Sequence, residues 1–363
     1  MRGWRRWVCL MLLICLLPLW AGAQAIPTDE AGKPLNVSGQ CLYQDRLLLW
    51  TGKTLYQWTQ TEGARVLGQA PEGTAFTHLV AEDDRLYGYD MMSRLLYPLR
   101  LDEGGLYAGQ PLSLIADLFD DPQNEDLSPD ALVLVGQRLY ALYRPGYLGG
   151  WQGLIYAFDM HSGQGRSLDI PFPQALCRGP GDTLWLMSHD HRSASDTLDK
   201  SDDMPGLLRL DTHSGELSDW GRFKQPFDNM DLPEMPYDEQ TGDLYYAMSG
   251  RLWRRDRDGQ EHIAALLPQL DGMSGAGKPL LLLHDGSLSL ISRGQAQLMS
   301  PEAQQSMLAS APLTLYGVSD ISQHEKIMQS LPDLAIQRMD QHWEGPGQLG
   351  QQLAGGASDI DVL

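Results

Sequence analysis

The chain has 363 residues, with 27 lysines and arginines against 47 aspartates and glutamates, and a formal net charge of −20. This excess of acidic residues argues against a surface that binds nucleic acid or an anionic membrane, because either would need a basic patch. The length allows one large domain or two.

The first 25 residues predict a cleaved secretory signal peptide. Arginines near the start are followed by an apolar run at 7–20 and by small residues at 21–25, which suit signal peptidase. Pro18 interrupts the apolar run, which is shorter than the roughly 20 residues of a membrane-spanning helix. We therefore predict cleavage after Ala25 and a location outside the cytoplasm, whether secreted, periplasmic or at the cell surface.

The mature chain retains two cysteines, Cys41 and Cys177. Two cysteines in a secreted protein allow one disulfide, but they are far apart and the sequence alone does not pair them. Each stands in an apolar setting typical of a strand. Two buried free thiols are therefore an equally good interpretation.

Residues 26–300 contain a repeated unit, in which a polar turn leads into a strand that carries leucine and aromatic residues. The unit occurs at 45–50, 84–89, 137–142, 182–187, 243–248 and 279–284. Two later strands also end alike, since Asp159 and Asp211 are each followed by a histidine and a Ser-Gly pair that reverses the chain. Alternating apolar residues between such turns predict short antiparallel strands.

Repeats of this kind predict a β-propeller. A four-stranded blade takes about 40–50 residues, and blades must stack in a ring because none buries its faces alone. We therefore predict a mainly β fold, with a β-propeller of about six blades over 26–300; a β-sandwich is the competing architecture. The leucine–aromatic pairs and aspartate turns resemble the PQQ-like and YVTN-like propeller families at the level of the repeat.

A different pattern follows a linker at 301–311. The segment 312–363 predicts the order β-α-β-α-β, with the first helix ending at Pro332. This order is the opening of a parallel α/β domain. Its predicted elements are a strand at 312–318, a helix at 321–331, a strand at 334–339, a helix at 347–354 and a strand at 359–363.

This tail resembles the first segment of the extracellular solute-binding proteins of ABC importers. The resemblance lies in the helix that closes on Pro332-Asp333 and in the small-residue turn before the strand at 359–363. Such a protein needs two lobes, so we expect a truncated copy or an accessory unit. The resemblance implies that the loop after the first tail strand faces a ligand, which makes Ser319 and Asp320 candidate ligand-binding residues. Trp343 is a third candidate, for stacking on the ligand.

The remaining motifs that could belong to a catalytic or metal site are better interpreted as loops. The phosphate-loop spacing at 272–278 is followed by Pro279, where a Ser or Thr would hold magnesium. The histidines and aspartates at 189–191 and the acidic run at 120–126 lack the spacing of a metal site. No G-x-S-x-G elbow is present, and the His-Glu pair at 324–325 is not a zinc motif. We therefore predict no catalytic residue, no metal site and no cofactor.

These observations predict a secreted, non-enzymatic binding protein. The more specific hypothesis is a propeller-fused solute-binding component of an ABC importer, which takes a sugar or peptide and contacts the importer's membrane component. The alternatives are a propeller enzyme with a channel site built from several blades, and an interaction scaffold for envelope proteins. Four aromatic residues near loops are candidates for stacking on a sugar or peptide: Tyr143, Tyr147, Trp151 and Trp220.

Overall fold

The structure is a computed structural model with side chains. It describes residues 27–29, 31–59, 62–74, 76–102, 105–121, 124, 127–144, 153–188, 205–223, 235–248, 251–266, 280–284, 287–292, 295–300, 313–315 and 336–338. The predicted signal peptide and the predicted helices of the tail lie outside these residues. Within them, no helix is long and apolar enough to cross a membrane.

Six antiparallel sheets follow one another along the described chain, each built from consecutive strands. Sheet 1 contains β1 (Gly39–Tyr43), β2 (Arg46–Trp50), β3 (Thr54–Thr59) and β4 (Gly63–Gln69). Sheet 2 contains β5 (His78–Glu82), β6 (Arg85–Asp90), β7 (Leu95–Asp102), β8 (Gly105–Ala108) and β9 (Leu112–Ser113). A short 3-10 helix, η2 (Asp117–Asp120), follows sheet 2.

The remaining sheets continue the series. Sheet 3 contains β10 (Ala131–Val135), β11 (Arg138–Tyr143), β12 (Leu154–Asp159) and β13 (Gly165–Ser167). Sheet 4 contains β14 (Pro173–Arg178), β15 (Thr183–Ser188), β16 (Gly206–Asp211) and β17 (Leu217–Arg222). Sheet 5 contains β18 (Leu244–Met248), β19 (Arg251–Arg255) and β20 (Glu261–Leu266), and sheet 6 contains β21 (Leu280–His284), β22 (Ser287–Ser292) and β23 (Gln295–Met299).

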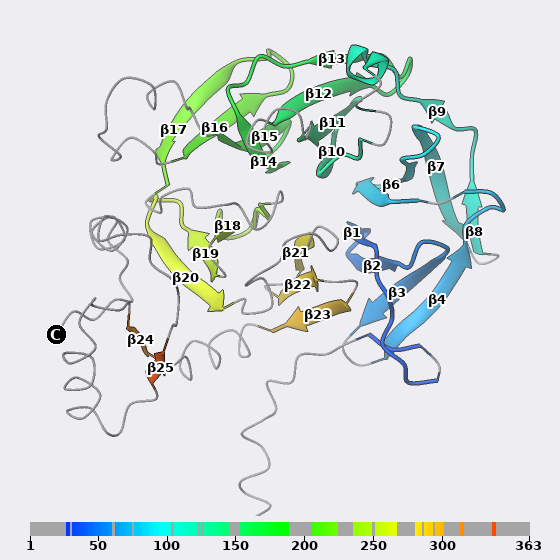
Figure 1. Cartoon of the computed structure of the whole chain (residues 1–363), viewed down its shortest axis with the longest axis horizontal. Helices are drawn as coiled ribbons and strands as arrows, with labels where there is room; N and C mark the ends of the chain where they lie inside the picture. The colour runs from blue at the N-terminus through cyan, green and yellow to red at the C-terminus, as the bar shows by residue number, and fades with distance from the viewer. Residues whose placement is uncertain are drawn as a thin grey trace, which may run out of the picture.

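The sheets form a ring, so the predicted β-propeller is confirmed (Figure 1). Sheet 6 meets sheet 1 through a reciprocal buried pair, in which Gln40 Nε2 donates to the Ser289 carbonyl at 3.0 Å and Ser289 Oγ donates to Gln40 Oε1 at 2.6 Å. Buried apolar side chains fill the space between neighbouring sheets. Trp50 shows the pattern, since its ring lies 5.2 Å from that of Phe76 and its Nε1 donates to the Phe76 carbonyl at 2.7 Å.

The repeated unit corresponds to the second strand of sheets 1 to 4, namely β2, β6, β11 and β15. The fifth copy is β18, which follows an isolated antiparallel bridge between Tyr237 and Leu244. The sixth copy of the repeated unit occupies a different position in its sheet. The leucine run at 280–284 is β21, the first strand of its sheet, and β22 is the second. The run lacks an aromatic residue that would distinguish the two strands.

The two matching turns have one structure. Asp159 Oδ1 accepts hydrogen bonds from the amides of His161 and Ser162, at 3.0 and 2.8 Å. Asp211 Oδ1 does the same after β16. The following glycine adopts a left-handed φ of 73° in the first turn and 76° in the second, a conformation that costs glycine little.

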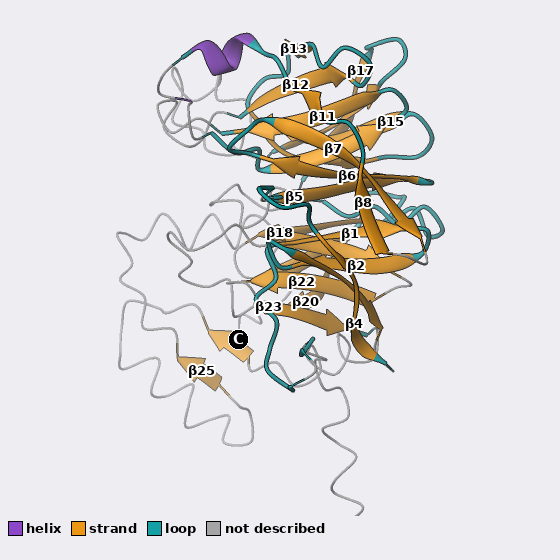
Figure 2. Ribbon diagram, turned by 90° about the vertical axis from the view of Figure 1, so that its right-hand side faces the viewer, coloured by secondary structure: helices purple, strands orange, loops and turns teal. Residues whose placement is uncertain are grey.

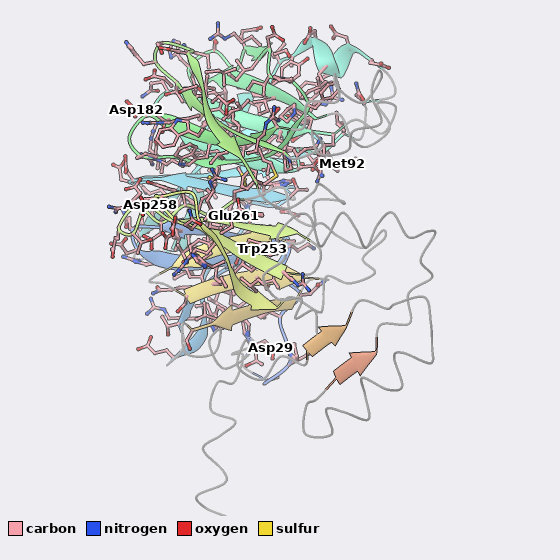
Figure 3. All side chains as sticks on the ribbon, turned by 90° about the vertical axis from the view of Figure 1, so that its left-hand side faces the viewer. Asp29, Met92, Asp182, Trp253, Asp258 and Glu261 are labelled. Atoms are coloured by element: carbon pink, nitrogen blue, oxygen red, sulfur yellow. The ribbon has the colours of Figure 1, made fainter. Side chains whose placement is uncertain are left out.

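The connections divide the ring into two faces (Figures 2 and 3). On the short-turn face, strands are joined by turns such as 83–84 and 212–216. On the opposite face, which we call the long-loop face, lie the turn at 91–94 and the described residues 114–121, which include η2. Figure 3 shows Asp182 on the first face and Met92 on the opposite one.

The tail contributes two described strands. β24 (Leu313–Leu315) pairs in parallel with β25 (Ile336–Arg338). The parallel pairing of the two predicted strands is therefore confirmed. Ser319, Asp320 and Trp343 lie outside the described residues, so their predicted role stays a prediction.

Candidate functional site

A cluster of aromatic and charged side chains lies between sheets 2 and 3 on the long-loop face. We call it the tyrosine cluster and define it by five residues: Tyr89, Arg94, Phe119, Tyr143 and Tyr156. Tyr89 and Tyr143 stand at or next to the last residues of the second strands β6 and β11, Tyr156 lies on β12, and Phe119 lies on η2. The repeat itself therefore brings an aromatic residue to the loop end of two adjacent sheets.

The segment that carries η2 reaches the cluster by adding to the outer edge of sheet 3. The Ile115 amide donates to the Gly163 carbonyl at 2.9 Å, and the Gly165 amide donates to the Ile115 carbonyl at 2.7 Å. Gly163 permits this approach, because a Cβ there would lie 2.0 Å from the Ser113 carbonyl oxygen. The chain then turns inward, and Leu118 is buried among the same residues.

The rings of the cluster contact one another. The Phe119 ring lies 5.9 Å from that of Tyr143, edge to face, and the Tyr143 ring lies 6.1 Å from that of Tyr156. The Arg94 guanidinium carbon lies 4.4 Å from the Phe119 ring centre, a cation–π contact. The Tyr156 hydroxyl donates to Asp117 Oδ1 at 2.8 Å.

Arg94 has an unusual backbone conformation, with a φ of 55°. Its amide closes a turn onto the Met91 carbonyl at 3.3 Å, and Asp90 Oδ1 accepts the Met92 amide at 3.0 Å within the same turn. A left-handed backbone at a residue other than glycine costs roughly 1 kcal/mol and tends to occur at functional sites. This strain accompanies an arginine placed against an aromatic ring.

The Tyr89 and Tyr143 hydroxyls are buried and interact with each other, and neither has another hydrogen-bond partner among the described residues. Burial raises the pKa of Tyr89 to about 12 and that of Tyr143 well above its ordinary value. The nearby Arg94 charge opposes both shifts. At neutral pH both hydroxyls are therefore protonated and can donate a hydrogen bond. Buried polar atoms are seldom left without a partner in native proteins, so the one hydroxyl proton that this pair leaves over calls for an acceptor.

A buried ion pair stands beside the cluster in the sequence. Arg144 Nε contacts Asp130 Oδ2, and the Asp130 side chain has no exposed surface. Burial lowers the pKa of Arg144. Because Asp130 precedes β10 and Arg144 follows β11, the pair ties the loop ends of two neighbouring strands. Removal of one partner would leave the other charge buried, which is strongly destabilising.

The short-turn face carries a second charged group, which bridges three sheets. Glu82, at the end of β5, contacts Arg85 and lies 3.1 Å from Arg178 of sheet 4. Both its oxygens also accept the Gly136 amide of sheet 3 at 3.1 Å. Since Glu82 satisfies these donors, the group has the character of a tie between sheets rather than an open binding site.

The two mature cysteines are both free and buried, in separate apolar clusters. This outcome decides between the two interpretations of the sequence in favour of buried thiols. Burial raises the pKa of Cys41 to about 12 and also raises that of Cys177. Neither thiol is therefore suited to act as a nucleophile.

The aromatic residues expected near loops have different outcomes. Tyr143 is fully buried, so its predicted role as an exposed stacking surface is wrong; the η2 segment covers it, and the sequence does not show this long-range contact. Trp220 is 47% exposed, as expected. Tyr147 and Trp151 lie outside the described residues. Among the described side chains, no three metal-ligating groups come together.

No protein-family model matches the chain, and no curated protein matches its sequence. Solved structures similar to it include a gluconolactonase from Xanthomonas campestris, with 16% identity over 76% of this chain and 94% of that one, at a TM-score of 0.46. A virginiamycin B lyase from Staphylococcus aureus matches with 10% identity over 76% of this chain and 98% of that one, at 0.44. A chain of a nidogen/laminin complex matches with 15% identity over 71% and 94%, at 0.44.

These similar structures include enzymes as well as a protein–protein complex. The prediction that the chain is not an enzyme is therefore contradicted. The physical reason is that a propeller assembles its sites from side chains of several sheets, so the absence of a local catalytic motif does not exclude activity. At these identities the similarity concerns the fold and does not assign a function.

Proposed function

We propose that this protein is an extracytoplasmic β-propeller that binds a carboxylate-bearing ligand, a sugar acid or a peptide, at the tyrosine cluster. The observation that carries the proposal is the pair of buried Tyr89 and Tyr143 hydroxyls, which interact with each other and have no further hydrogen-bond partner among the described residues. Both are protonated at neutral pH, so when one hydroxyl donates to the other, the second O–H still has a proton to donate. A hydroxyl donor beside the Arg94 cation suits an oxygen that carries negative charge.

The setting favours a ligand with a single charge. The chain has a formal net charge of −20, and this field opposes the approach of anions with several charges. Tyr89 and Tyr143 have no exposed surface and η2 covers Tyr143, so a ligand reaches the hydroxyls and Arg94 only when η2 moves aside. The aromatic rings then provide apolar surface around these polar groups. A few polar groups in an apolar surround are typical of small-molecule sites.

The extracytoplasmic location rests on the sequence of the first 25 residues. Secretion of the full chain and the intact mass of the product test it. A mass that begins at Ile26 supports the location, and a product that keeps residues 1–25 inside the cell contradicts it.

A thermal-shift screen tests the ligand. We expect sugar acids or acidic dipeptides to raise the melting temperature of the wild-type protein, whereas the corresponding neutral sugars and amides do not. A ligand at 100 times its Kd stabilises by about 2.7 kcal/mol. The double variant Tyr89→Phe/Tyr143→Phe should lose this shift, and the control Tyr107→Phe, which removes a hydroxyl from an exposed residue on β8, should keep it.

An equal shift in both variants, or no shift from any acid, would contradict the proposal. If the protein consumes the stabilising compound, the tyrosine cluster is an active site and the protein is an enzyme. The release of product by wild type and its loss in the double variant would distinguish that case from binding alone.

A second candidate function is the solute-binding component of an ABC importer. Its support is the parallel pairing of β24 with β25, which matches the order expected from the resemblance of the tail. Replacement of Asp320 by Asn and of Trp343 by Ala tests it. These changes should weaken sugar or peptide binding if the tail holds the ligand, and should leave it unchanged if the tyrosine cluster does.

A further inference from the structure

A separate cavity of about 380 Å³ lies between sheets 3 and 4 at the short-turn face. Its size is within the range of about 300–1,000 Å³ that is typical of ligand sites. It lies at the opposite ends of the strands from the tyrosine cluster, and no residue of that cluster lines it. Its lining is mixed and has somewhat more polar than apolar surface. The lining residues include Arg138, Tyr140, Arg166, Asp169, Leu210 and Leu217.

The register of sheet 3 explains the opening. Tyr140 is the partner of Ala157, and Ala157 is the partner of Arg166, so the three side chains form one row across β11, β12 and β13. The small alanine in the middle of this row leaves space between the two long side chains. β13 ends after Ser167, so the outer strand does not close the cavity.

The opposite wall comes from sheet 4. Leu210 is buried at the end of β16, and Leu217 begins β17, where it is 38% exposed. Arg138 Nη1 donates to the Thr212 carbonyl at 2.9 Å across the two sheets. This bond links the two walls of the cavity.

Two charged groups on the rim have no ion pair. Arg166 is exposed, and neither it nor Asp169 makes a hydrogen bond or salt bridge with the described residues. They are three positions apart in a chain that turns between β13 and β14. Arg166 and Asp169 therefore line the same cavity without pairing with each other.

We propose that this cavity binds an amino acid or the end of a peptide that carries an apolar side chain together with a free ammonium and a free carboxylate. The apolar side chain lies on Tyr140, Leu210 and Leu217. The carboxylate pairs with Arg166, and the ammonium pairs with Asp169. This arrangement satisfies both rim charges at once, which a purely anionic or cationic ligand does not.

Calorimetric titration of the full chain with L-leucine tests the proposal. We expect a Kd of about 1 mM for a ligand of this size. N-acetyl-L-leucine lacks the ammonium and L-leucinamide lacks the carboxylate, and each should bind at least about tenfold more weakly. The dipeptide Gly-Leu distinguishes a peptide end from a free amino acid as the ligand. If Gly-Leu binds more tightly than L-leucine, the ligand is a peptide end; if it binds more weakly, the ligand is a free amino acid.

Two variants test which residue pairs with each charged group of the ligand. Arg166→Gln should weaken L-leucine about tenfold with no effect on L-leucinamide, and Asp169→Asn should weaken L-leucine about tenfold with no effect on N-acetyl-L-leucine. Arg65→Gln, which changes an exposed arginine on β4, is the matched control. Equal melting temperatures show that all three variants fold. Absence of binding by both L-leucine and Gly-Leu up to about 10 mM, or binding unchanged in Arg166→Gln, would overturn the proposal.

Discussion

The contact between Gln40 and Ser289 joins the first and last sheets of the ring, and the change Ser289→Ala tests its contribution to stability. The Ser289 hydroxyl donates to Gln40 Oε1 at 2.6 Å, and both side chains are buried. In the variant, this amide oxygen loses the Ser289 hydroxyl as a donor in the interior of the protein. Loss of a buried hydrogen bond in this way costs about 1–3 kcal/mol.

This loss of stability corresponds to a lower melting temperature. A change of 1 kcal/mol lowers the melting temperature by about 2–4 °C in a domain of 150–250 residues. We therefore expect Ser289→Ala to melt about 2–12 °C below the wild type in differential scanning calorimetry. The control Ser287→Ala changes a half-buried serine on the same strand that makes no hydrogen bond with the described residues. It should stay within about 0.5 kcal/mol of wild type. Equal melting temperatures for the two variants would show that the Ser289 hydroxyl contributes nothing measurable to stability.

Three further predictions concern buried groups. Burial raises the pKa of Tyr89 from 10.0 to about 12, so the folded state holds this proton more tightly than the unfolded state. The free energy of unfolding should therefore fall as the pH rises from 10 to about 12, and fall less in Tyr89→Phe; equal slopes would contradict this. Cys41 and Cys177 should not react with iodoacetamide until the protein is unfolded, as intact mass will show, whereas labelling of the native protein would place a thiol at the surface. Gly88→Ala should destabilise by about 1–3 kcal/mol in urea unfolding, because a Cβ there would lie 2.7 Å from the Phe76 ring; wild-type stability would mean that the ring moves away freely.

The repeats were sufficient to predict the ring. Period-two alternation and a polar turn identify the second strand of sheets 1 to 4, because these features are local. The sixth unit was misplaced by one strand, since the leucines at 280–284 carry no feature that separates a first strand from a second.

The candidate sites were harder to predict, because they depend on contacts between distant segments. The sequence places Tyr143 beside a loop, and only the fold shows that η2 covers it. Ala157 becomes informative only when the register places it between Tyr140 and Arg166. A sequence shows residue types along a strand, whereas a site between two sheets needs the pairing of both.

The most direct test of the proposed function is a crystal structure of the full chain grown with the acid that raises its melting temperature most. We predict that a carboxylate oxygen of this compound lies about 2.5–3.0 Å from the Tyr89 and Tyr143 hydroxyls. Water alone at both hydroxyls, or the compound bound elsewhere, would contradict the assignment of the ligand site to the tyrosine cluster.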